Sequence, residues 1–87
     1  MTKEEKTAII AEYAVTEGDV GSPQVQVAVL TARIIELTSH MKEHPHDNHS
    51  RRGLVTLVNR RRSLLKYLNS KNHQAYLELI KKLGLKR

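Results

Sequence analysis

The most constraining feature of the chain is a run of apolar residues near its middle, spaced alternately three and four positions apart. The members of this seam are Val27, Leu30, Ile34, Leu37 and Met41. Such spacing places one apolar stripe on one side of a helix and is typical of a helix that packs along its whole length. Ser22 followed by Pro23 is typical of a helix start, and Pro45 stops the pattern. The sequence therefore predicts a helix over about 23–44, roughly 33 Å long.

A second long helix is predicted after a short polar turn at residues 46–49. Its apolar face consists of Leu54, Leu57, Val58, Leu64, Leu65 and Leu68. Asp47 or Ser50 can cap its start, and we expect the helix to fray near Ser70. Two long amphipathic helices joined by a short turn predict an antiparallel hairpin.

Two shorter helices are predicted at the ends of the chain. Thr2 and Glu5 have the spacing of a capping box before a helix over about 3–15, which is too short to be stable unless it docks on another element. Its short apolar face leaves its orientation open. Asn72 can cap a last helix, which Gly84 ends. With no segment of period two, the sequence predicts an all-α fold of four helices in one domain over residues 1–87, the short helices packing on the hairpin.

Composition and chain length exclude several classes of protein. The chain has no cysteine, which excludes a disulfide scaffold and a thiolate metal site. Its 87 residues bury too little surface for a deep substrate pocket. The longest apolar run, Val27–Leu30, is too short to span a membrane, and the N-terminus does not have the pattern of a signal peptide. We expect a soluble cytoplasmic protein with no cofactor and no membrane partner.

Charge is spread unevenly along the chain, whose net charge is +6. Residues 1–36 hold three basic and six acidic side chains, which gives −3, whereas residues 37–87 hold twelve basic and three acidic ones, which gives +9. A strongly basic half favours a polyanionic partner, because each phosphate that is neutralised releases condensed counterions.

Polar side chains form a stripe beside the apolar seam. At about 100° per residue, Gln26, Arg33 and His40 share one flank of the first long helix. The residues that share the corresponding flank of the second long helix are Gly53, Arg60 and Tyr67. An antiparallel turn near residue 47 brings both flanks to one face, with positive charge in its middle.

The three consecutive arginines of the second long helix cannot all face one ligand. Arg61 falls within the apolar stripe, so its stem can pack between the helices while its charged end reaches water. Arg60 and Arg62 point to opposite sides of the helix. Periodicity alone leaves open which of them contacts a ligand.

Two other interpretations of the same residues are open. Seven-residue spacing beside a seam is also typical of the solvated flank of a coiled coil, so a helical oligomerisation module is an alternative. Four histidines lie at positions 40, 44, 46 and 49, and with Asp47 they form a weaker candidate for a metal site. Ser50 beside His49 has no evident orienting group, and no glycine-rich loop resembles a phosphate-binding loop. The chain is therefore predicted not to be an enzyme.

Four ordered blocks of residues have a recognisable pattern. They read GDVGSPQVQV at 18–27, HMKEHPHDNHSRRGL at 40–54, RRRSLLKYL at 60–68 and LIKKLGL at 79–85. Together they resemble the bacterial-type small-subunit ribosomal protein S15 family, over essentially the whole chain and with the spacing of that family. The resemblance implies a four-helix protein that binds the central domain of 16S ribosomal RNA early in assembly and organises the platform of the small subunit.

The resemblance also implies two regions of RNA contact. The residues expected at a three-way RNA junction are Gly21, Ser22, Gln26, Arg33, Arg60, Arg62 and Tyr67. Those expected at a nearby minor groove with a G·U pair beside a G·C pair are His40, His44, Asp47, His49 and Ser50. Lys42, Arg51 and Arg52 are expected to contact phosphates, which position a protein without specifying sequence. Gly53 has no side chain and so lets the RNA approach the protein backbone closely.

The chemistry of the groove residues suits this expectation. In a G·U wobble the guanine amino group lacks its usual pyrimidine partner, and the wide minor groove of A-form RNA exposes it. The Asp47 carboxylate or the Ser50 hydroxyl could accept from that group, so Asp47 is predicted to determine specificity. Family resemblance further implies contacts with large-subunit RNA and neighbouring small-subunit proteins in the cytoplasmic ribosome, and repression of the messenger RNA of the protein in some members. We expect the free chain to be a monomer.

Overall fold

The structure of the chain, a computed structural model, describes residues 2–16, 18–19 and 21–85. They form four helices and, within these ranges, no strand. The helices are α1 (Lys3–Tyr13), α2 (Pro23–Glu43), α3 (Asn48–Lys71) and α4 (His73–Leu83). The predicted all-α fold is confirmed.

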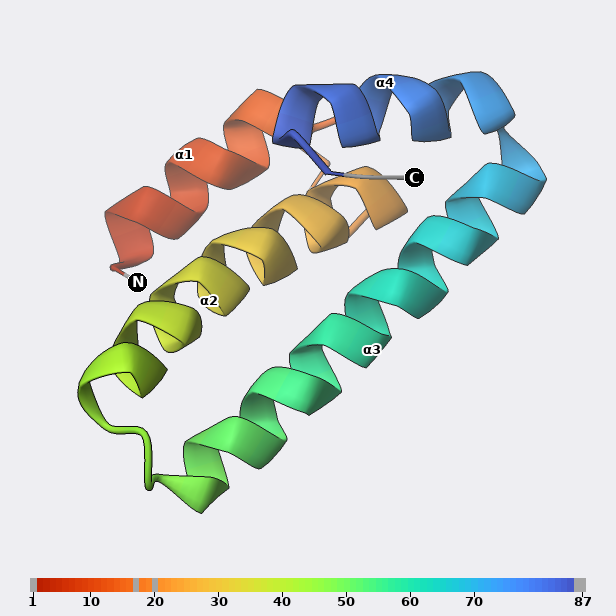
Figure 1. The fold of residues 1–87 in the computed structure, drawn as a ribbon. Helices are drawn as coiled ribbons and strands as arrows, with labels where there is room; N and C mark the ends of the chain where they lie inside the picture. The colour runs from red at the N-terminus through yellow and green to blue at the C-terminus, as the bar shows by residue number, and fades with distance from the viewer. Residues whose placement is uncertain (1, 17, 20, 86–87) are drawn as a thin grey trace.

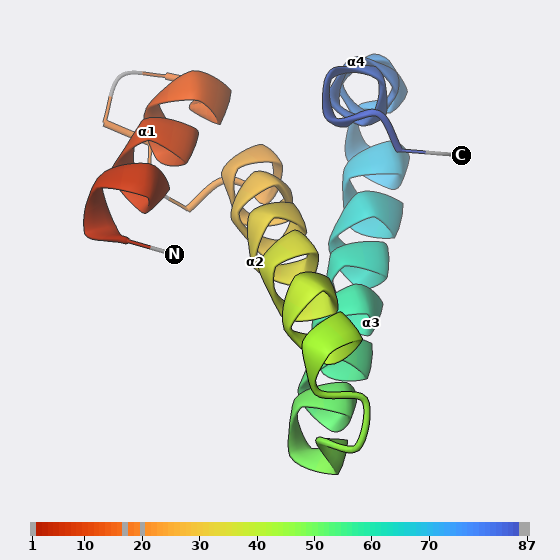
Figure 2. The ribbon, with the colours of Figure 1, turned by 60° about the vertical axis from the view of Figure 1, so that its left-hand side comes forward.

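Helices α2 and α3 run antiparallel and form the predicted hairpin (Figure 1). Figure 2 shows α2 between α1 and α3, with α4 lying across the end of α3. The turn between α2 and α3 lies at the end of the hairpin away from α4 (Figure 1). Among the described residues, no helix combines the length and hydropathy needed to cross a membrane.

Short-range signals fix where α1 and α2 begin. Thr2 and Glu5 form the predicted capping box at the start of α1. Ser22 Oγ accepts a hydrogen bond from the Val25 N–H at 3.3 Å, and Pro23 occupies the first helical position of α2. Helix α1 ends at Tyr13 rather than near residue 15, because Ala14 leaves the helical conformation and the next backbone N–H bonds the Asp19 carboxylate.

The second half of the chain is also bounded by caps. Asp47, not Ser50, caps α3. Asn72 alone connects α3 to α4: its backbone N–H donates to Leu68 O, and its side chain accepts from the Ala75 N–H. Gly84, with a φ of 70°, ends α4 in the left-handed conformation that glycine adopts readily.

The core lies where α4 closes the hairpin. Val27, Leu68 and Leu79 form its buried cluster. Of the predicted α2 seam, Val27, Leu30 and Ile34 are buried, whereas Leu37 and Met41, nearer the turn, are only partly covered. Only Leu68 of the predicted α3 face is buried, because α4 covers one end of the hairpin and leaves the turn end two helices thick.

Helix α1, whose orientation the sequence leaves open, lies along α2 and is held at its C-terminal end by α4. Tyr13 packs against the core cluster. Lys82 Nζ lies 4.3 Å from the centroid of the Tyr13 ring and donates to the backbone oxygen of Glu12 at 3.1 Å. These contacts set α1 beside the flank of α2 that carries the polar stripe.

Candidate nucleic-acid interface

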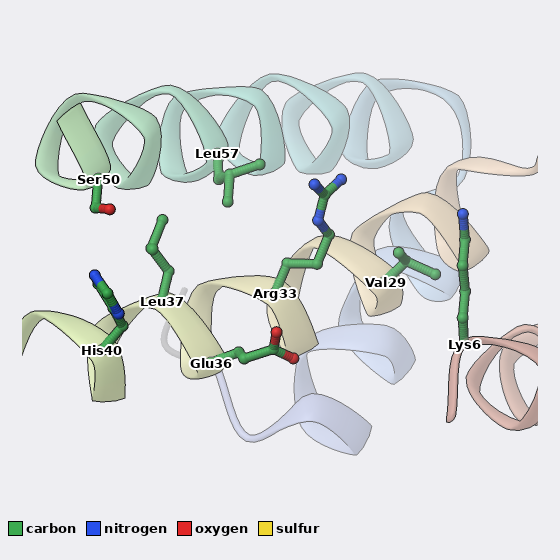
Figure 3. Close-up of a pocket in the computed structure, with 8 residues that line it drawn as sticks. All are labelled: Lys6, Val29, Arg33, Glu36, Leu37, His40, Ser50 and Leu57. Atoms are coloured by element: carbon green, nitrogen blue, oxygen red, sulfur yellow. The ribbon is translucent and has the colours of Figure 1, made fainter. Parts of the chain in front are cut away.

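The polar stripe predicted from periodicity forms one face of the molecule. A hollow of about 630 Å³ opens between α2 and α3, and its polar lining consists of Lys6, Arg33, Glu36, His40 and Ser50. Figure 3 shows His40 on α2 and Ser50 on α3 pointing toward one another across the hollow. A smaller hollow of about 170 Å³ shares Lys6 and Arg33 with the first and adds Gln26 and Arg60. The structure therefore brings together stripe residues from both long helices.

The charge of this face is mainly positive. Lys6, Arg33 and Arg60 contribute three positive charges to the linings of the two hollows, against one negative charge from Glu36. Lys6 comes from α1 and was not among the predicted site residues, because its position depends on how α1 docks. A positively charged face at the middle of α2 and α3 can bind the phosphate backbone of a nucleic acid.

Asp47 is the centre of a hydrogen-bonded cluster at the turn. Its Oδ2 accepts from Ser50 Oγ at 2.6 Å and contacts His40 Nε2 at 2.9 Å, while its Oδ1 accepts from the Ser50 N–H at 3.0 Å. The two hydrogen bonds from Ser50, followed by that from His40, hold the pKa of the Asp47 carboxyl well below its ordinary value. The cluster joins the last turn of α2 to the first turn of α3.

The other predicted groove and phosphate residues surround this cluster. The ring centroid of His44 lies 4.6 Å from that of His40. Arg51 Nη2 donates to the backbone oxygen of Pro45 at 2.7 Å, so this guanidinium also ties the turn together. The predicted groove and phosphate residues that are exposed around the turn are Lys42, His44, His49, Arg51 and Arg52.

Asp19 organises the loop at the other end of the stripe. Its carboxylate accepts from the backbone N–H groups of Val15, Gly21 and Ser22, at 3.0, 3.1 and 2.9 Å. Hydrogen bonds from the Ser22 side chain and the Val15 N–H lower the pKa of Asp19 to about 2. Gln26 Nε2 donates to Gly21 O at 2.7 Å and so joins the loop to the stripe. Asp19 was not among the predicted site residues, although aspartate two residues before glycine is typical of an Asx turn.

The structure places Arg60 apart from the other two arginines of α3. Arg60 lines the smaller hollow of the stripe face. Arg61 Nη1 donates to Thr31 Oγ1 on α2 at 3.3 Å, and burial lowers the pKa of its guanidinium. Arg62 lines a different hollow of about 490 Å³, between α3 and α4, together with Arg61, Lys66 and Tyr76. Arg61 is therefore a packing residue, and only Arg60 joins the stripe.

Tyr67 is 52% exposed, which leaves its ring available for stacking, and Lys71 Nζ lies 5.8 Å from the ring centroid. It is not among the residues that line the two stripe hollows.

Gly53 packs loosely within the hairpin, since an added Cβ would lie 3.8 Å from Leu37 Cδ2, an ordinary contact. The fold itself does not require glycine at this position.

Metal binding and nucleophilic catalysis receive no support from this geometry. Within residues 2–16, 18–19 and 21–85, no three His, Asp or Glu side chains are placed to hold a metal ion. Ser50 Oγ donates to the Asp47 carboxylate rather than to a histidine, unlike the nucleophile–base pair of a hydrolase.

Comparison with known proteins identifies relatives along the full chain. The family model described as Ribosomal protein S15 matches residues 6–86. The small ribosomal subunit protein uS15 of Acinetobacter baylyi is 58% identical over 87 residues, which cover 100% of this chain and 98% of that protein. The small ribosomal subunit protein uS15 of Roseiflexus castenholzii is 61% identical over 87 residues, with the same coverage of 100% and 98%.

These matches confirm the resemblance seen in the four sequence blocks. The matched family consists of structural, RNA-binding proteins of the ribosome rather than enzymes, which confirms the prediction of a non-enzymatic chain. The chain belongs to the ribosomal protein S15 family.

Proposed function

We propose that this protein is a structural component of the small ribosomal subunit that binds the central domain of 16S ribosomal RNA at a three-way junction and at a neighbouring minor groove with a G·U pair. The observation that carries the proposal is the pair of adjoining hollows on one face of α2 and α3, which share Lys6 and Arg33. Gln26, Arg33 and Arg60 lie toward one end of this face, and His40 and Ser50 lie toward the turn.

The distance between the two ends of the face gives the mechanism. Gln26 and His40 are fourteen residues apart on α2, which places them roughly 21 Å apart along the helix axis. Both ends belong to one packed hairpin, so they hold two RNA elements at a fixed separation. Binding then favours the junction geometry in which both elements are reached at once.

The turn end of the hairpin suits a minor groove. A-form RNA has a wide, shallow minor groove that exposes base edges and 2′-hydroxyls to short polar side chains. His40, Asp47 and Ser50 form a compact polar cluster at the narrow tip of the hairpin, where neither α1 nor α4 thickens it (Figure 1). His44 and His49 flank this cluster, and Lys42, Arg51 and Arg52 supply positive charge for phosphates.

The end of the face away from the turn can bind the phosphate backbone of an RNA junction. Arg33, Arg60 and Lys6 can neutralise phosphates that crowd together where RNA helices meet. Gly21 and Ser22, held by Asp19, offer a small loop for close approach, and Tyr67 offers an exposed ring for base stacking. Arg62 is left out of this contact, because it faces the hollow between α3 and α4.

The relatives are small ribosomal subunit proteins by name, which supports a wider role in the ribosome as part of the proposal. The proposal includes early binding during assembly, organisation of the platform, a contact with large-subunit RNA and contacts with neighbouring small-subunit proteins in the cytoplasmic ribosome. It also includes repression of its own messenger RNA.

An RNA that contains the junction and the G·U groove tests the proposal. Two base pairs inserted between these elements should weaken binding at least tenfold, because one rigid hairpin can no longer reach both. The control RNA carries the same insertion beyond the groove. Chemical footprinting should show protection of both elements in the unmodified RNA. Equal affinity for all three RNAs, or protection of one element only, would contradict the proposal.

A further inference from the structure

Helix α1 has few features of its own that would hold it in place. It has 11 residues, none of them buried, and a helix of this length is marginal unless it docks on another element. Its last turn carries no basic side chain, so no side chain of α1 itself balances the partial negative charge of its C-terminal carbonyl groups. The C-terminal end of α1 therefore depends on groups that other helices supply.

Lys82 of α4 supplies such a group. Its Nζ donates to the backbone oxygen of Glu12 at 3.1 Å and lies 4.3 Å from the centroid of the Tyr13 ring. The ammonium group thus satisfies one of the last carbonyl oxygens of α1, balances the helix dipole and makes a cation–π contact. Tyr13 also packs against the core cluster, so this end of α1 is held both to the core and to α4.

Lys6 lies on the same side of α1 as Tyr13. The two residues are seven positions apart, which places them roughly 10 Å apart along the helix axis and only about 20° apart around it. Ile10 lies between them and lines the smaller stripe hollow together with Lys6. Because α1 is one continuous helix, the hold on its end at Tyr13 also sets where Lys6 reaches, and Lys6 lines both stripe hollows.

We infer that Lys82 is a positioning residue for RNA binding, which holds the C-terminal end of α1 and thereby keeps Lys6 at the stripe face, where Lys6 contacts an RNA phosphate. The inference rests on the proposed function and adds to it a residue outside the stripe. Lys82 lines neither stripe hollow, but a separate hollow of about 180 Å³ that it shares with Glu12 and Tyr13. Its effect on RNA binding therefore passes through α1.

A double-mutant cycle with Lys6 tests this coupling. The measurement is the dissociation constant for the RNA with the junction and groove, at about 0.1 M salt. In the wild-type protein, Lys6→Gln should weaken binding roughly 3- to 10-fold, the loss of one phosphate contact. Lys82→Met keeps the length of the side chain but removes the ammonium group. In this background Lys6→Gln should weaken binding less than about twofold, because Lys6 is no longer held at the stripe face.

Two matched variants separate positioning from charge and from stability. Lys81→Met removes the same charge from a neighbouring exposed position on α4, which does not line the hollow of Glu12 and Tyr13, and should keep the full effect of Lys6→Gln. Lys82→Arg retains a cation that can donate to Glu12 and lie over the Tyr13 ring, so it should keep the full effect as well.

A Lys82 side chain that only stabilised the fold would leave the effect of Lys6→Gln unchanged in every background. If Lys6→Gln weakens binding as much in Lys82→Met as in the wild type, the inference is wrong. It is also wrong if Lys82→Arg loses the effect of Lys6→Gln as Lys82→Met does.

The position of α1 can also be measured without RNA. The chain has no cysteine, so spin labels can be attached through Glu4→Cys on α1 and Ser39→Cys on α2, both at exposed positions. Electron paramagnetic resonance should give a narrow distribution of distances between the labels for the labelled parent protein and for Lys81→Met. Lys82→Met should broaden or shift it. The same distribution for Lys81→Met and Lys82→Met would contradict the inference.

The wild-type protein distinguishes failure of the inference from failure of the proposed function. If Lys6→Gln leaves the affinity unchanged while the wild type still prefers the junction RNA to an unrelated duplex, the inference is wrong and the proposed function stands. If the wild type binds the junction RNA no better than the unrelated duplex, the proposed function itself is contradicted.

Discussion

Arg61 of α3 reaches across the hairpin and donates a hydrogen bond to Thr31 Oγ1 of α2, at 3.3 Å. Thr31 is buried, and its hydroxyl in turn donates to Val27 O at 2.8 Å. The central arginine of the Arg60–Arg62 run thus connects the two long helices next to the core. Its neighbours on either side remain exposed to solvent.

Thr31→Val should destabilise the fold, because it removes the acceptor of the Arg61 hydrogen bond while keeping the shape of the side chain. We expect the free energy of unfolding in urea to fall by about 1 kcal/mol. Thr56→Val is a matched control, since Thr56 makes the same bond to the carbonyl oxygen four residues earlier, at 3.0 Å, but is exposed. The control should change stability by less than about 0.5 kcal/mol. Equal losses in both variants would show that the cross-helix bond contributes nothing.

Arg60→Gln and Arg62→Gln remove the same charge from opposite sides of α3. On an RNA with the junction and groove, Arg60→Gln should reduce the slope of log affinity against log salt concentration by about 0.7–0.9, the loss of one phosphate contact. Arg62→Gln should leave the slope nearly unchanged, because Arg62 faces the hollow between α3 and α4. A reduced slope for Arg62→Gln alone would contradict the assignment of the junction to the stripe face.

Acid should destabilise the loop before α2. Hydrogen bonds from Ser22 and Val15 lower the pKa of Asp19 from 3.8 to about 2, so the folded state favours the ionised carboxylate. The ionised Asp19 carboxylate therefore contributes fully to the free energy of unfolding above about pH 5, and this contribution is lost as the pH falls toward about 2. The urea midpoint of the wild type should therefore fall over this range, and that of Asp19→Asn should fall less. Parallel curves for the two proteins would contradict this prediction.

Gly53→Ala should have opposite effects on stability and on RNA binding. An added Cβ makes only an ordinary contact with Leu37, and alanine is the better helix former, so the free energy of unfolding should rise by roughly 0.5–1 kcal/mol. If the RNA backbone approaches α3 at this position, affinity should fall nonetheless. Unchanged affinity in titrations with the junction RNA would show that Gly53 is not a contact.

The free protein should sediment as a monomer of 9.9 kDa at micromolar concentration in RNA-free buffer. The apolar seam that could join two chains is already used within one chain, where Val27, Leu30 and Ile34 are buried. A stable dimer would instead favour the alternative of a helical oligomerisation module. A variant with the exposed Ile35 changed to lysine should sediment like the wild type.

The helices could be predicted from the sequence because their ends depend on short-range signals. The capping residues bond to groups within a few residues, so the local sequence is sufficient to predict the helix ends. These caps are Ser22, which precedes Pro23, and Asn72 and Gly84. The polar stripe could also be predicted, since helical periodicity alone decides that Gln26, Arg33 and His40 share one flank.

What the sequence could not predict depends on the docking of α1 and on the conformations of the loops, which have no regular period. The early end of α1 follows from the Asp19 carboxylate, which binds the Val15 N–H from across the loop. The position of Lys6 depends on how α1 docks. The use of Asp47 as the cap of α3 also brings together Ser50 and His40, a hydrogen-bonded arrangement that spacing along the chain does not reveal.

The single-residue corner at Asn72 ties the direction of α4 to the rotational phase of α3. One inserted residue would rotate everything beyond the corner by about 100°. Leu79 would then turn away from Val27 and Leu68, although no side chain had been replaced. The number of residues at this corner is therefore as important for the packing of the core as the identity of the core residues.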